Sequence, residues 1–296
     1  MAKREGESST ARRQAGDAVS IDTALAALET LLGVRIVLLD RGGFFHSREG
    51  RALIGRRWQS HRKNTVCALG FSNERCIGHC RHEINARGEE LRAPFVHTCW
   101  RGLQEVVVPL VHDDQHVGSL FAGAWRRPGT DAPLCRQSLP RAAVEAYRAL
   151  PEFDAARAEV LGRALALVAQ GLMAQLEHRM AWDVAPGSRK AEVRRFLRRN
   201  AAKPVRLEEV AELLHLSPPR ASHVVKELFG KSFRDLVRDE RVNRAKCLLQ
   251  TTDVPVGEVA RLVGVDDPYH FNRVFKACVG MPPGKYRHAT GKQGVW

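Results

Sequence analysis

The chain has 296 residues, a net charge of +14, 44% hydrophobic residues and 27% charged residues. This length suits two domains with a core each, and the composition is that of a globular protein. No apolar run is long enough to cross a bilayer and the N-terminal stretch is polar, which argues against a membrane protein or a secreted one and favours the cytoplasm. In that compartment, the seven cysteines are thiols or metal ligands rather than disulfides.

The positive charge is concentrated in the last third of the chain. Residues 188–296 hold 22 Lys and Arg against 12 Asp and Glu, a net of +10. Such a concentration favours a polyanionic partner, because each neutralised phosphate releases condensed counterions. On charge alone, a solvated basic surface explains the pattern equally well.

In chain order, residues 1–20 are polar and predict a disordered tail. A mixed α/β domain is expected over residues 21–127, with a helix from Asp22 to Leu32 and a strand at 35–39. Two further strands, 106–111 and 117–122, flank a turn at 113–115. Strands joined by so short a turn predict an antiparallel sheet.

Residues 128–187 predict a helical linker that begins with a proline-containing loop and ends in a short linker at 185–188. Its main element is a long helix over 154–182, because apolar residues recur every three to four positions. One interpretation is a helix packed on its own domain. The other is a dimerisation helix, which implies a homodimer. The recurring residues are Leu161, Leu165, Val168, Leu172, Leu176 and Met180.

Residues 188–296 predict an all-helical domain with two similar units. In each unit a short helix carries a Val-Ala pair, a tight turn follows, and a second helix begins at Ser217 or Asp267 with Pro next. Gly264 supplies positive φ in the second turn. The second helices have inward apolar stripes, which leaves an outward face for double-stranded DNA. These stripes are Ala221, Val224, Val225 and Leu228 in the first unit, and Phe271, Val274 and Phe275 in the second.

Four segments of this region together resemble the AraC/XylS family of transcription regulators. They are the second unit (Asp267-Pro268-Tyr269-His270-Phe271-Asn272-Arg273-Val274-Phe275-Lys276), its tail (280–287), the connecting segment 233–249 and the break at 251–253. The first unit departs from that family at Arg220-Ala221 and Val225, and the second at Val265, which shrinks the core without changing its character. The resemblance implies that the two second helices enter successive major-groove segments about 34 Å apart. It also implies activation and an RNA polymerase partner.

The expected DNA-facing residues are Pro219, Ser222, His223, Lys226, Pro268, Tyr269, Asn272, Arg273 and Lys276. Asn suits adenine and Arg suits guanine by bidentate geometry. The two lysines suit phosphate, which positions the protein without reading sequence, and His223 suits base or phosphate.

Four cysteines fall close together in the N-terminal half, interleaved with His61, His79, His82 and His97. Four thiolates suit tetrahedral zinc or an iron–sulfur cluster, so Cys67, Cys76, Cys80 and Cys99 are candidate metal ligands. Redox-sensitive thiols, and small buried side chains that pack or line a ligand pocket, are the alternatives. Cys135, Cys247 and Cys278 are expected to be structural, and the latter two to pack in the core of the helical domain.

The same region resembles the PocR-type sensory domain, a PAS-like α/β sensor of small organic molecules. The matching residues are Val66-Cys67, Glu74-Arg75-Cys76, Cys99 with Gly102-Leu103, Val108-Pro109-Leu110 and Val117-Gly118 to Gly123. Cys80 stands where that family usually has Asp, and Trp100 where it usually has His, so the pocket and its ligand are expected to differ.

The sequence therefore predicts an α+β protein with an N-terminal PAS-like α/β sensor and an all-α double helix-turn-helix domain at 188–296. Its expected function is DNA-binding regulation of transcription in response to a small molecule, metal or redox signal. Two alternatives are a regulator fused to a thiol- or metal-based enzyme, and a constitutive DNA-binding protein. Neither a Ser-His-Asp arrangement nor a Gly-rich phosphate loop supports the enzyme.

Overall fold

The structure is a computed structural model that describes residues 21–47, 49–70, 72–180 and 187–290. The predicted disordered tail and the first half of the short linker at 185–188 lie outside these residues. The chain divides into two compact parts, Met1–Val34 and Arg35–Trp296. Helix α2 (Ile21–Leu32) is the described helix of the smaller part and matches the expected element. No described helix is long and apolar enough to span a membrane.

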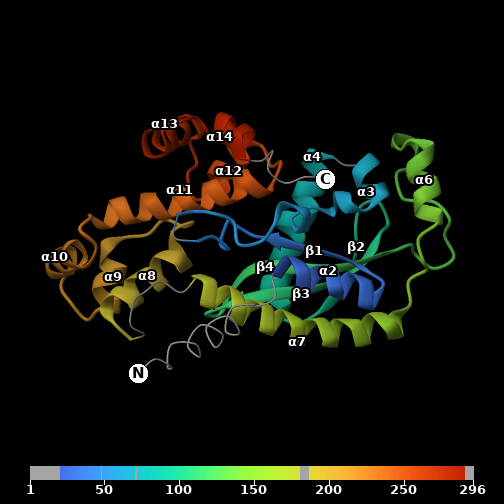
Figure 1. Ribbon diagram of the computed structural model, residues 1–296, viewed down its shortest axis with the longest axis horizontal. Helices are drawn as coiled ribbons and strands as arrows, with labels where there is room; N and C mark the ends of the chain where they lie inside the picture. The colour runs from blue at the N-terminus through green and yellow to red at the C-terminus, as the bar shows by residue number, and fades with distance from the viewer. Residues whose placement is uncertain (1–20, 48, 71, 181–186, 291–296) are drawn as a thin grey trace, which may run out of the picture. The chain divides into compact units, whose positions relative to one another are not determined.

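A four-stranded antiparallel sheet is the centre of the sensor half of the larger part (Figure 1). Its strands are β1 (Arg35–Asp40), β2 (Phe95–Thr98), β3 (Gln104–His112) and β4 (Gln115–Trp125), in the order β1-β4-β3-β2. Asp113 and Asp114, both with positive φ, form the turn between β3 and β4, as expected for a two-residue hairpin. The predicted strands and their antiparallel pairing are confirmed.

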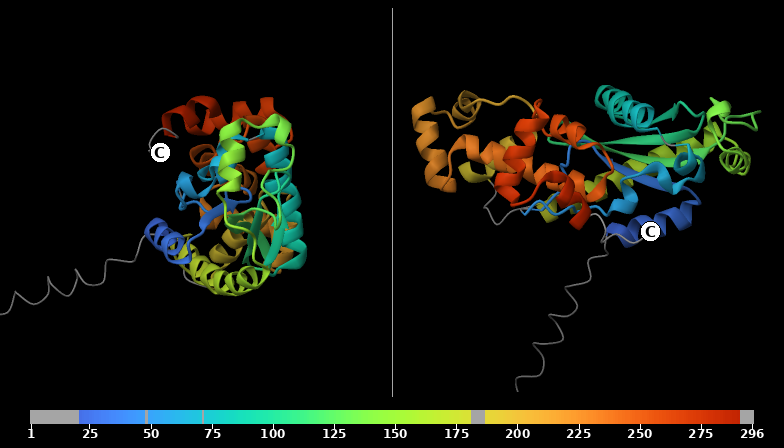
Figure 2. Two further views of the ribbon diagram at one scale, coloured as in Figure 1. Left: turned by 90° about the vertical axis from the view of Figure 1, so that its right-hand side faces the viewer. Right: turned by 90° about the horizontal axis from the view of Figure 1, so that it is seen from above.

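The two faces of this sheet are covered by different helices, because successive side chains of a strand point to opposite sides. On one face, Val107 and Phe121 pack with Ile84 of α5 (Ile84–Leu91). On the other face, Gly162 of α7 (Ala155–Met180) lies close enough to Val106 that a Cβ there would be 3.5 Å from its Cγ1. Figures 1 and 2 show α7 running along the sheet.

Helix α7 packs against β3 with the predicted apolar stripe. Leu161, Leu165, Leu172 and Leu176 are buried, and Val168 is half-buried, which supports the interpretation of a helix packed on its own domain. Residues 181 and 182 lie outside the described residues, and so does the side chain of Met180.

Short helices and loops complete the sensor half. They are η1 (Arg56–Trp58), η2 (His61–Lys63), α3 (Thr65–Leu69), α4 (Asn73–Ile77), the π-helix η3 (Gly78–Glu83), η4 (Arg136–Ser138) and α6 (Arg141–Arg148). A π-helical segment is rare and is frequently found at functional sites. Here it carries Cys80.

The DNA-binding half, residues 188–290, is all helical, as predicted. Its helices are α8 (Arg189–Asn200), α9 (Leu207–Leu213), α10 (Pro218–Phe229), α11 (Phe233–Thr251), α12 (Val256–Leu262), α13 (Pro268–Val279) and α14 (Pro283–Thr290). Two apolar cores form, one around Val210, Val224 and Val225 and one around Phe271 and Phe275. The long helix α11 contributes residues to both cores.

Candidate nucleic-acid interface and sensor cavity

Helices α10 and α13 are the second helices of the two helix-turn-helix units. Helix α13 begins at Asp267, whose side chain accepts a hydrogen bond from the Tyr269 amide at 2.9 Å, a standard N-cap. In the turn before it, Gly264 has a φ of 84°, as expected. In the first unit His215 makes the equivalent turn with a φ of 54°. The sequence did not indicate this, because histidine has no general preference for positive φ.

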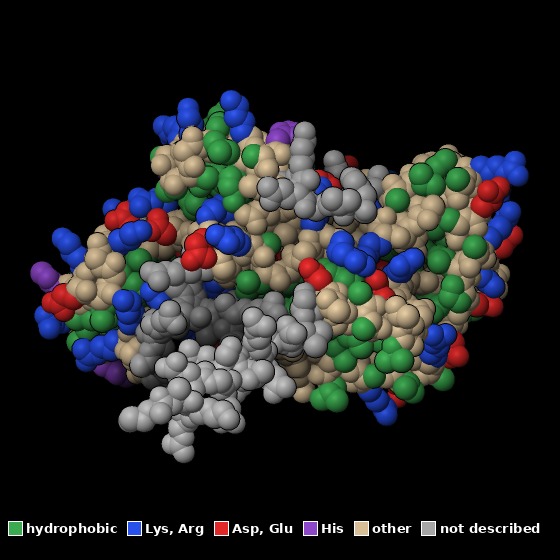
Figure 3. Space-filling model, viewed as in Figure 1, with side chains coloured by type: hydrophobic (Ala, Val, Ile, Leu, Met, Phe, Trp, Pro, Cys, Tyr) green, Lys and Arg blue, Asp and Glu red, His purple; other side chains and the backbone are tan. Residues whose placement is uncertain are grey.

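All nine predicted DNA-facing residues are exposed on the two helices. Tyr269 is 83% exposed, which is unusual for an aromatic side chain with no role at the surface. The Asn272 amide donates to the Pro268 carbonyl at 2.8 Å, so its side chain lies along α13 in the unbound protein. Figure 3 shows Lys and Arg side chains on the surface over α10 and α13.

A cavity of about 100 Å³ lies in the sensor half, and all four clustered cysteines line it. Cys67 comes from α3, Cys76 from α4 and Cys80 from η3, while Cys99 follows β2. We call this space the sensor cavity. The sequence pattern placed the four thiols in one region, and the fold brings them to one site.

The sulfur of Cys76 accepts two hydrogen bonds, from the Ser72 amide and from the Trp100 indole N–H, both at 3.4 Å. The Arg101 guanidinium lies 3.8 Å from the centre of the Trp100 ring, in a cation–π arrangement. Trp100 was singled out in the sequence as a departure from the PocR pattern. It thus directly contacts one of the cavity thiols.

Glu105 of β3 is a buried carboxylate in the cavity wall. His97 Nε2 lies 3.2 Å from its Oε2, and His61 Nε2 lies 3.5 Å from the same oxygen. Burial alone would raise the pKa of Glu105, but the two histidines hold it well below its ordinary value. His97 in turn contacts His79 at 3.3 Å, and His79 contacts the exposed Glu83 at 2.9 Å. A chain of polar contacts therefore joins the buried carboxylate to the surface.

Three of the four cavity thiols, Cys67, Cys80 and Cys99, are protonated at neutral pH. Burial, and then the negative charge of Glu105, raises the pKa of Cys67 and Cys80 well above the ordinary value and that of Cys99 to about 12. Glu105 and Gln59 are cavity residues that the sequence did not single out, because neither has a motif and both come from elements separate from the cysteines. Gln59 Oε1 accepts from the Asp40 amide at 3.0 Å, while its buried Nε2 has no partner among the described residues.

No group of three or more His, Cys, Asp or Glu side chains in the described part of the chain is arranged to hold a metal ion. Zinc or an iron–sulfur cluster at the four cysteines stays a prediction. Of the other three cysteines, Cys247 is buried as expected. Cys278 is exposed, so the expectation that it packs in the core of the helical domain is wrong, and Cys135 is exposed as well. Cys278 follows the buried Phe275 by three positions but turns out to lie on the open side of α13.

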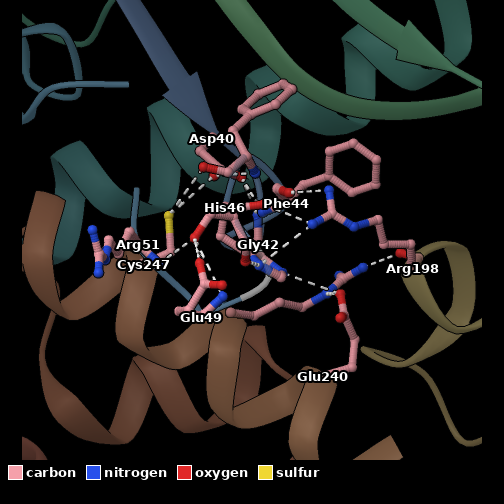
Figure 4. A network of polar contacts seen from close by, with 12 residues as sticks. Asp40, Gly42, Phe44, His46, Glu49, Arg51, Arg198, Glu240 and Cys247 are labelled. Atoms are coloured by element: carbon pink, nitrogen blue, oxygen red, sulfur yellow. Dashed lines mark hydrogen bonds and ion pairs between the residues drawn. The ribbon is translucent and has the colours of Figure 1, made fainter. Parts of the chain in front are cut away.

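The loop from Asp40 to Leu53 joins the sensor half to α8 and α11 (Figure 4). His46 Nε2 lies 3.2 Å from Glu240 of α11, and Arg198 of α8 donates to the His46 carbonyl at 2.6 Å. The side chain of Asp40 accepts from the Phe44 amide at 2.7 Å, which shapes the loop. These side chains are buried. We call residues 40–53 the docking loop.

The paired helix-turn-helix units define a DNA-binding protein, and comparisons with known proteins agree. Residues 210–289 match a family described as a helix-turn-helix domain, and residues 17–176 match the sensory domain found in PocR. Because the second match spans more than half of the 296 residues, the chain belongs to the family that carries the PocR sensory domain. The AraC-type and PocR-type resemblances predicted from the sequence are confirmed.

The relatives are transcription regulators. The arabinose operon regulatory protein of Salmonella typhimurium is 42% identical over 81 residues, which cover 27% of this chain and 29% of that protein. The regulatory protein PocR of the same organism is 26% identical over 217 residues, or 66% of this chain and 71% of that protein. The transcriptional activator RhaR of Klebsiella pneumoniae is 29% identical over 58% of this chain and 60% of its own. The chain spans less than a third of the arabinose regulators' length.

Among solved structures, the C-terminal domain of the response regulator AraT from Geobacillus stearothermophilus is 31% identical, with a TM-score of 0.34. It covers 36% of this chain and 88% of that one. The DNA-binding domain of AdpA, solved in complex with a target DNA, is 25% identical, also with a TM-score of 0.34, and covers 36% of this chain and 96% of that one.

Proposed function

We propose that the chain is an effector-responsive transcription regulator that binds double-stranded DNA through both helix-turn-helix units. The observation that carries the proposal is the pair of fully exposed recognition faces on α10 and α13, in a chain that also holds a lined cavity in its sensor half. The net charge of +10 over residues 188–296 supports the same partner.

The cavity favours a small effector with a hydrogen-bond acceptor. The Nε2 of Gln59 is a buried donor without a partner among the described residues, and such donors normally find an acceptor. Four arginines, Arg56, Arg62, Arg81 and Arg101, also line the cavity and offer further donors to such an acceptor.

Selection of bound duplexes from a random library tests DNA binding. We expect an enriched site with two separate conserved blocks about one helical turn apart, one for each recognition helix. A single short block would show that only one unit reads DNA. No enrichment over a library passed through without protein would contradict the function.

The proposal includes two protein partners, RNA polymerase and a second copy of the chain. Recruitment of RNA polymerase and activation of transcription are proposed from the resemblance to the AraC/XylS family. Homodimer formation is supported by the outward face of α7, where Val160 and Leu167 are 69% and 71% exposed at positions one heptad apart. Sedimentation of the wild type and of a Val160→Glu, Leu167→Glu variant tests it, since a dimer through this face would dissociate.

The metal hypothesis for the sensor is tested separately. About one zinc per chain, or iron with a thiolate absorption band, in anaerobically purified protein would support a metal or cluster sensor if a Cys76→Ser variant lost it. Colourless, metal-free protein would exclude that hypothesis and leave an organic effector.

A further inference from the structure

The wall of the sensor cavity is not made by the sensor half alone. Thr251, Thr252, Asp253 and Val254 line it together with the four cysteines. These residues connect the end of α11 to the start of α12, the first helix of the second helix-turn-helix unit. The cavity is therefore bounded on one side by the linker that leads into the second unit.

The carboxylate of Asp253 joins this wall to the sensor half. It forms ion pairs with Arg56 of η1 and, at 3.4 Å, with Arg62 of η2, and both arginines also line the cavity. The side chain of Asp253 is 47% exposed, so the two pairs are accessible to water. Ion pairs this exposed are weak and break readily. We call Arg56, Arg62 and Asp253 the latch.

The segment that carries Cys76 and Cys80 also contacts the second unit. Ile77 packs against the apolar core that includes Val254 and Val256. His82 Nε2 lies 3.2 Å from Glu258 of α12. One short segment, α4 with the π-helix η3, thus touches the cavity on one side and the second unit on the other.

The sensor half touches the first unit through α8, away from the cavity. Arg198 donates to the docking loop, and Arg195 lies 3.4 Å from Asp113 in the β3–β4 turn. The apolar core of the first unit is built from residues of α8 to α11 and the loops between them, and no residue of the sensor half belongs to it. The cavity is lined by no residue of α8, α9 or α10. Among the described residues, the cavity wall is therefore continuous with the second unit and not with α9 or α10.

The cavity is also small for a ligand site. Its volume of about 100 Å³ is well below the ~300–1,000 Å³ that small-molecule sites usually have. An effector has to enlarge it. Only Asp253 of this wall is tied to the sensor half by the exposed ion pairs of the latch. Thr251, Thr252 and Val254 are buried against the DNA-binding half, where the threonine hydroxyls donate to carbonyls of α11 and Val254 belongs to an apolar core.

We propose that the sensor cavity gates the second helix-turn-helix unit alone: an occupant displaces the wall at residues 251–254, opens the latch and frees α12 and α13 while α9 and α10 stay as they are. This gate rests on the effector cavity of the proposed function. Because coupling between two sites is reciprocal, opening the latch by mutation must also open the cavity.

The test uses the full-length protein without DNA or effector, so its result is independent of whether the chain binds DNA. N-ethylmaleimide alkylation, followed by mass spectrometry of each cysteine peptide, measures access to the cavity. Amide hydrogen exchange over residues 256–279 and 207–229 measures the freedom of the two units. The wild type is compared with Asp253→Asn and with an Arg56→Gln, Arg62→Gln variant that opens the latch from the sensor side.

We expect each latch variant to raise the alkylation rate of Cys76 and Cys80 about fivefold, which is the population shift that losing an exposed ion pair of this kind allows. Exchange should rise in α12 and α13 and stay constant in α9 and α10. The exposed Cys135 and Cys278 should react at unchanged rates. Asp239→Asn is the matched control, since Asp239 of α11 forms a comparable exposed ion pair with Lys231 and does not line the sensor cavity.

Three outcomes would overturn the gate. Unchanged alkylation in both latch variants would show that residues 251–254 do not close the cavity. Equal increases of exchange in both units would show a general loosening rather than a gate on one unit. An effect of Asp253→Asn that the arginine variant does not reproduce would place the role of Asp253 within the DNA-binding half alone.

Discussion

Arg273 and Asn272 lie next to each other on the exposed side of α13, behind the N-cap Asp267. A bidentate guanidinium recognises guanine in the major groove, whereas an ammonium group recognises phosphate as a point charge. Arginine side chains can therefore read the base sequence, whereas lysine side chains only bind the DNA phosphate backbone.

Replacing Arg273 by Ala should relax the preference at one base position and cost about 1–3 kcal/mol of binding free energy on the selected site. Replacing Lys226 by Ala should weaken binding to all sequences alike and lower the salt dependence. Fluorescence anisotropy on the selected site and on single-base variants measures both. An Arg273→Ala protein that loses the same affinity on every duplex would contradict base reading by this residue.

His116 of β4 is buried between strand and helix, with Nε2 3.0 Å from the Ser119 hydroxyl. Burial, with a contribution from Arg41, lowers the pKa of His116 to about 4. An unfolded histidine has a pKa of about 6.5, so on acidification the unfolded state takes up a proton before the folded state does. Folding stability should therefore fall as the pH drops from 7 towards 4.

Between pH 7 and pH 5 this residue alone should remove about 2 kcal/mol of the free energy of unfolding. Urea unfolding of the wild type and of His116→Gln at the two pH values measures the difference. The variant should show a pH dependence that is smaller by about that amount. The same substitution at the exposed His270 should leave the pH dependence as in the wild type, and a wild-type-like profile of His116→Gln would refute the assignment.

The site residues that could be predicted from the sequence are those whose position follows from the periodic spacing of apolar residues along a helix or strand. Once Phe271 and Phe275 are assigned to the core, the remaining side of α13 has to face outward. All nine predicted DNA-facing residues, on α10 and α13 together, are exposed. Gln59 and Asp253 were not identified, because their partners Asp40 and Arg56 lie 19 and 197 positions away along the chain. Cys278 was assigned to the core from its apolar character, and the structure places it in solvent.

At the scale of elements, the docking loop depends on two glycines that let it lie against α11. Gly43 has a φ of 71°, and a Cβ there would collide with the backbone of Arg244. Gly50 has a φ of 75° and lies against Asn243 in the same way. Side chains at these points would push the loop from the helix that joins the two helix-turn-helix units.

Gly43→Ala should therefore be more destabilising than Gly129→Ala. Gly129 has a φ of 66° but open space around its missing Cβ, so alanine there costs about 1 kcal/mol for the left-handed backbone. At Gly43 the collision with Arg244 should add about 1–3 kcal/mol. Urea unfolding of both variants gives the comparison, and equal losses would mean that the loop does not rest on α11 in solution.

The elements themselves were largely predictable. The β3–β4 hairpin and α7 follow from strand alternation and from a three-to-four residue period, and the second turn follows from Gly264. The π-helix Gly78–Glu83 and the turn at His215 were not, because both are imposed by packing rather than by local preference. Neither has a residue that marks it in the sequence.

At the scale of the whole molecule, the sequence predicted two domains and said nothing about how they touch. The docking loop, the latch and the contact of Ile77 join residues that lie about 200 positions apart. Each uses ordinary residues in contacts that local patterns do not encode. The functional link between cavity and DNA is therefore a property of the tertiary structure.

Control of DNA binding by the sensor cavity is tested by comparing the DNA affinity of the protein before and after alkylation of its cavity cysteines. A Cys135→Ser, Cys278→Ser background removes the exposed thiols, so that N-ethylmaleimide modifies the cavity cysteines. We expect alkylation to raise affinity for the selected two-block site at least about fivefold, as a coupling between two sites does. Affinity for a site whose α13 block is scrambled should not change. Equal affinity of the modified and unmodified protein for the intact site would contradict control of DNA binding by the cavity.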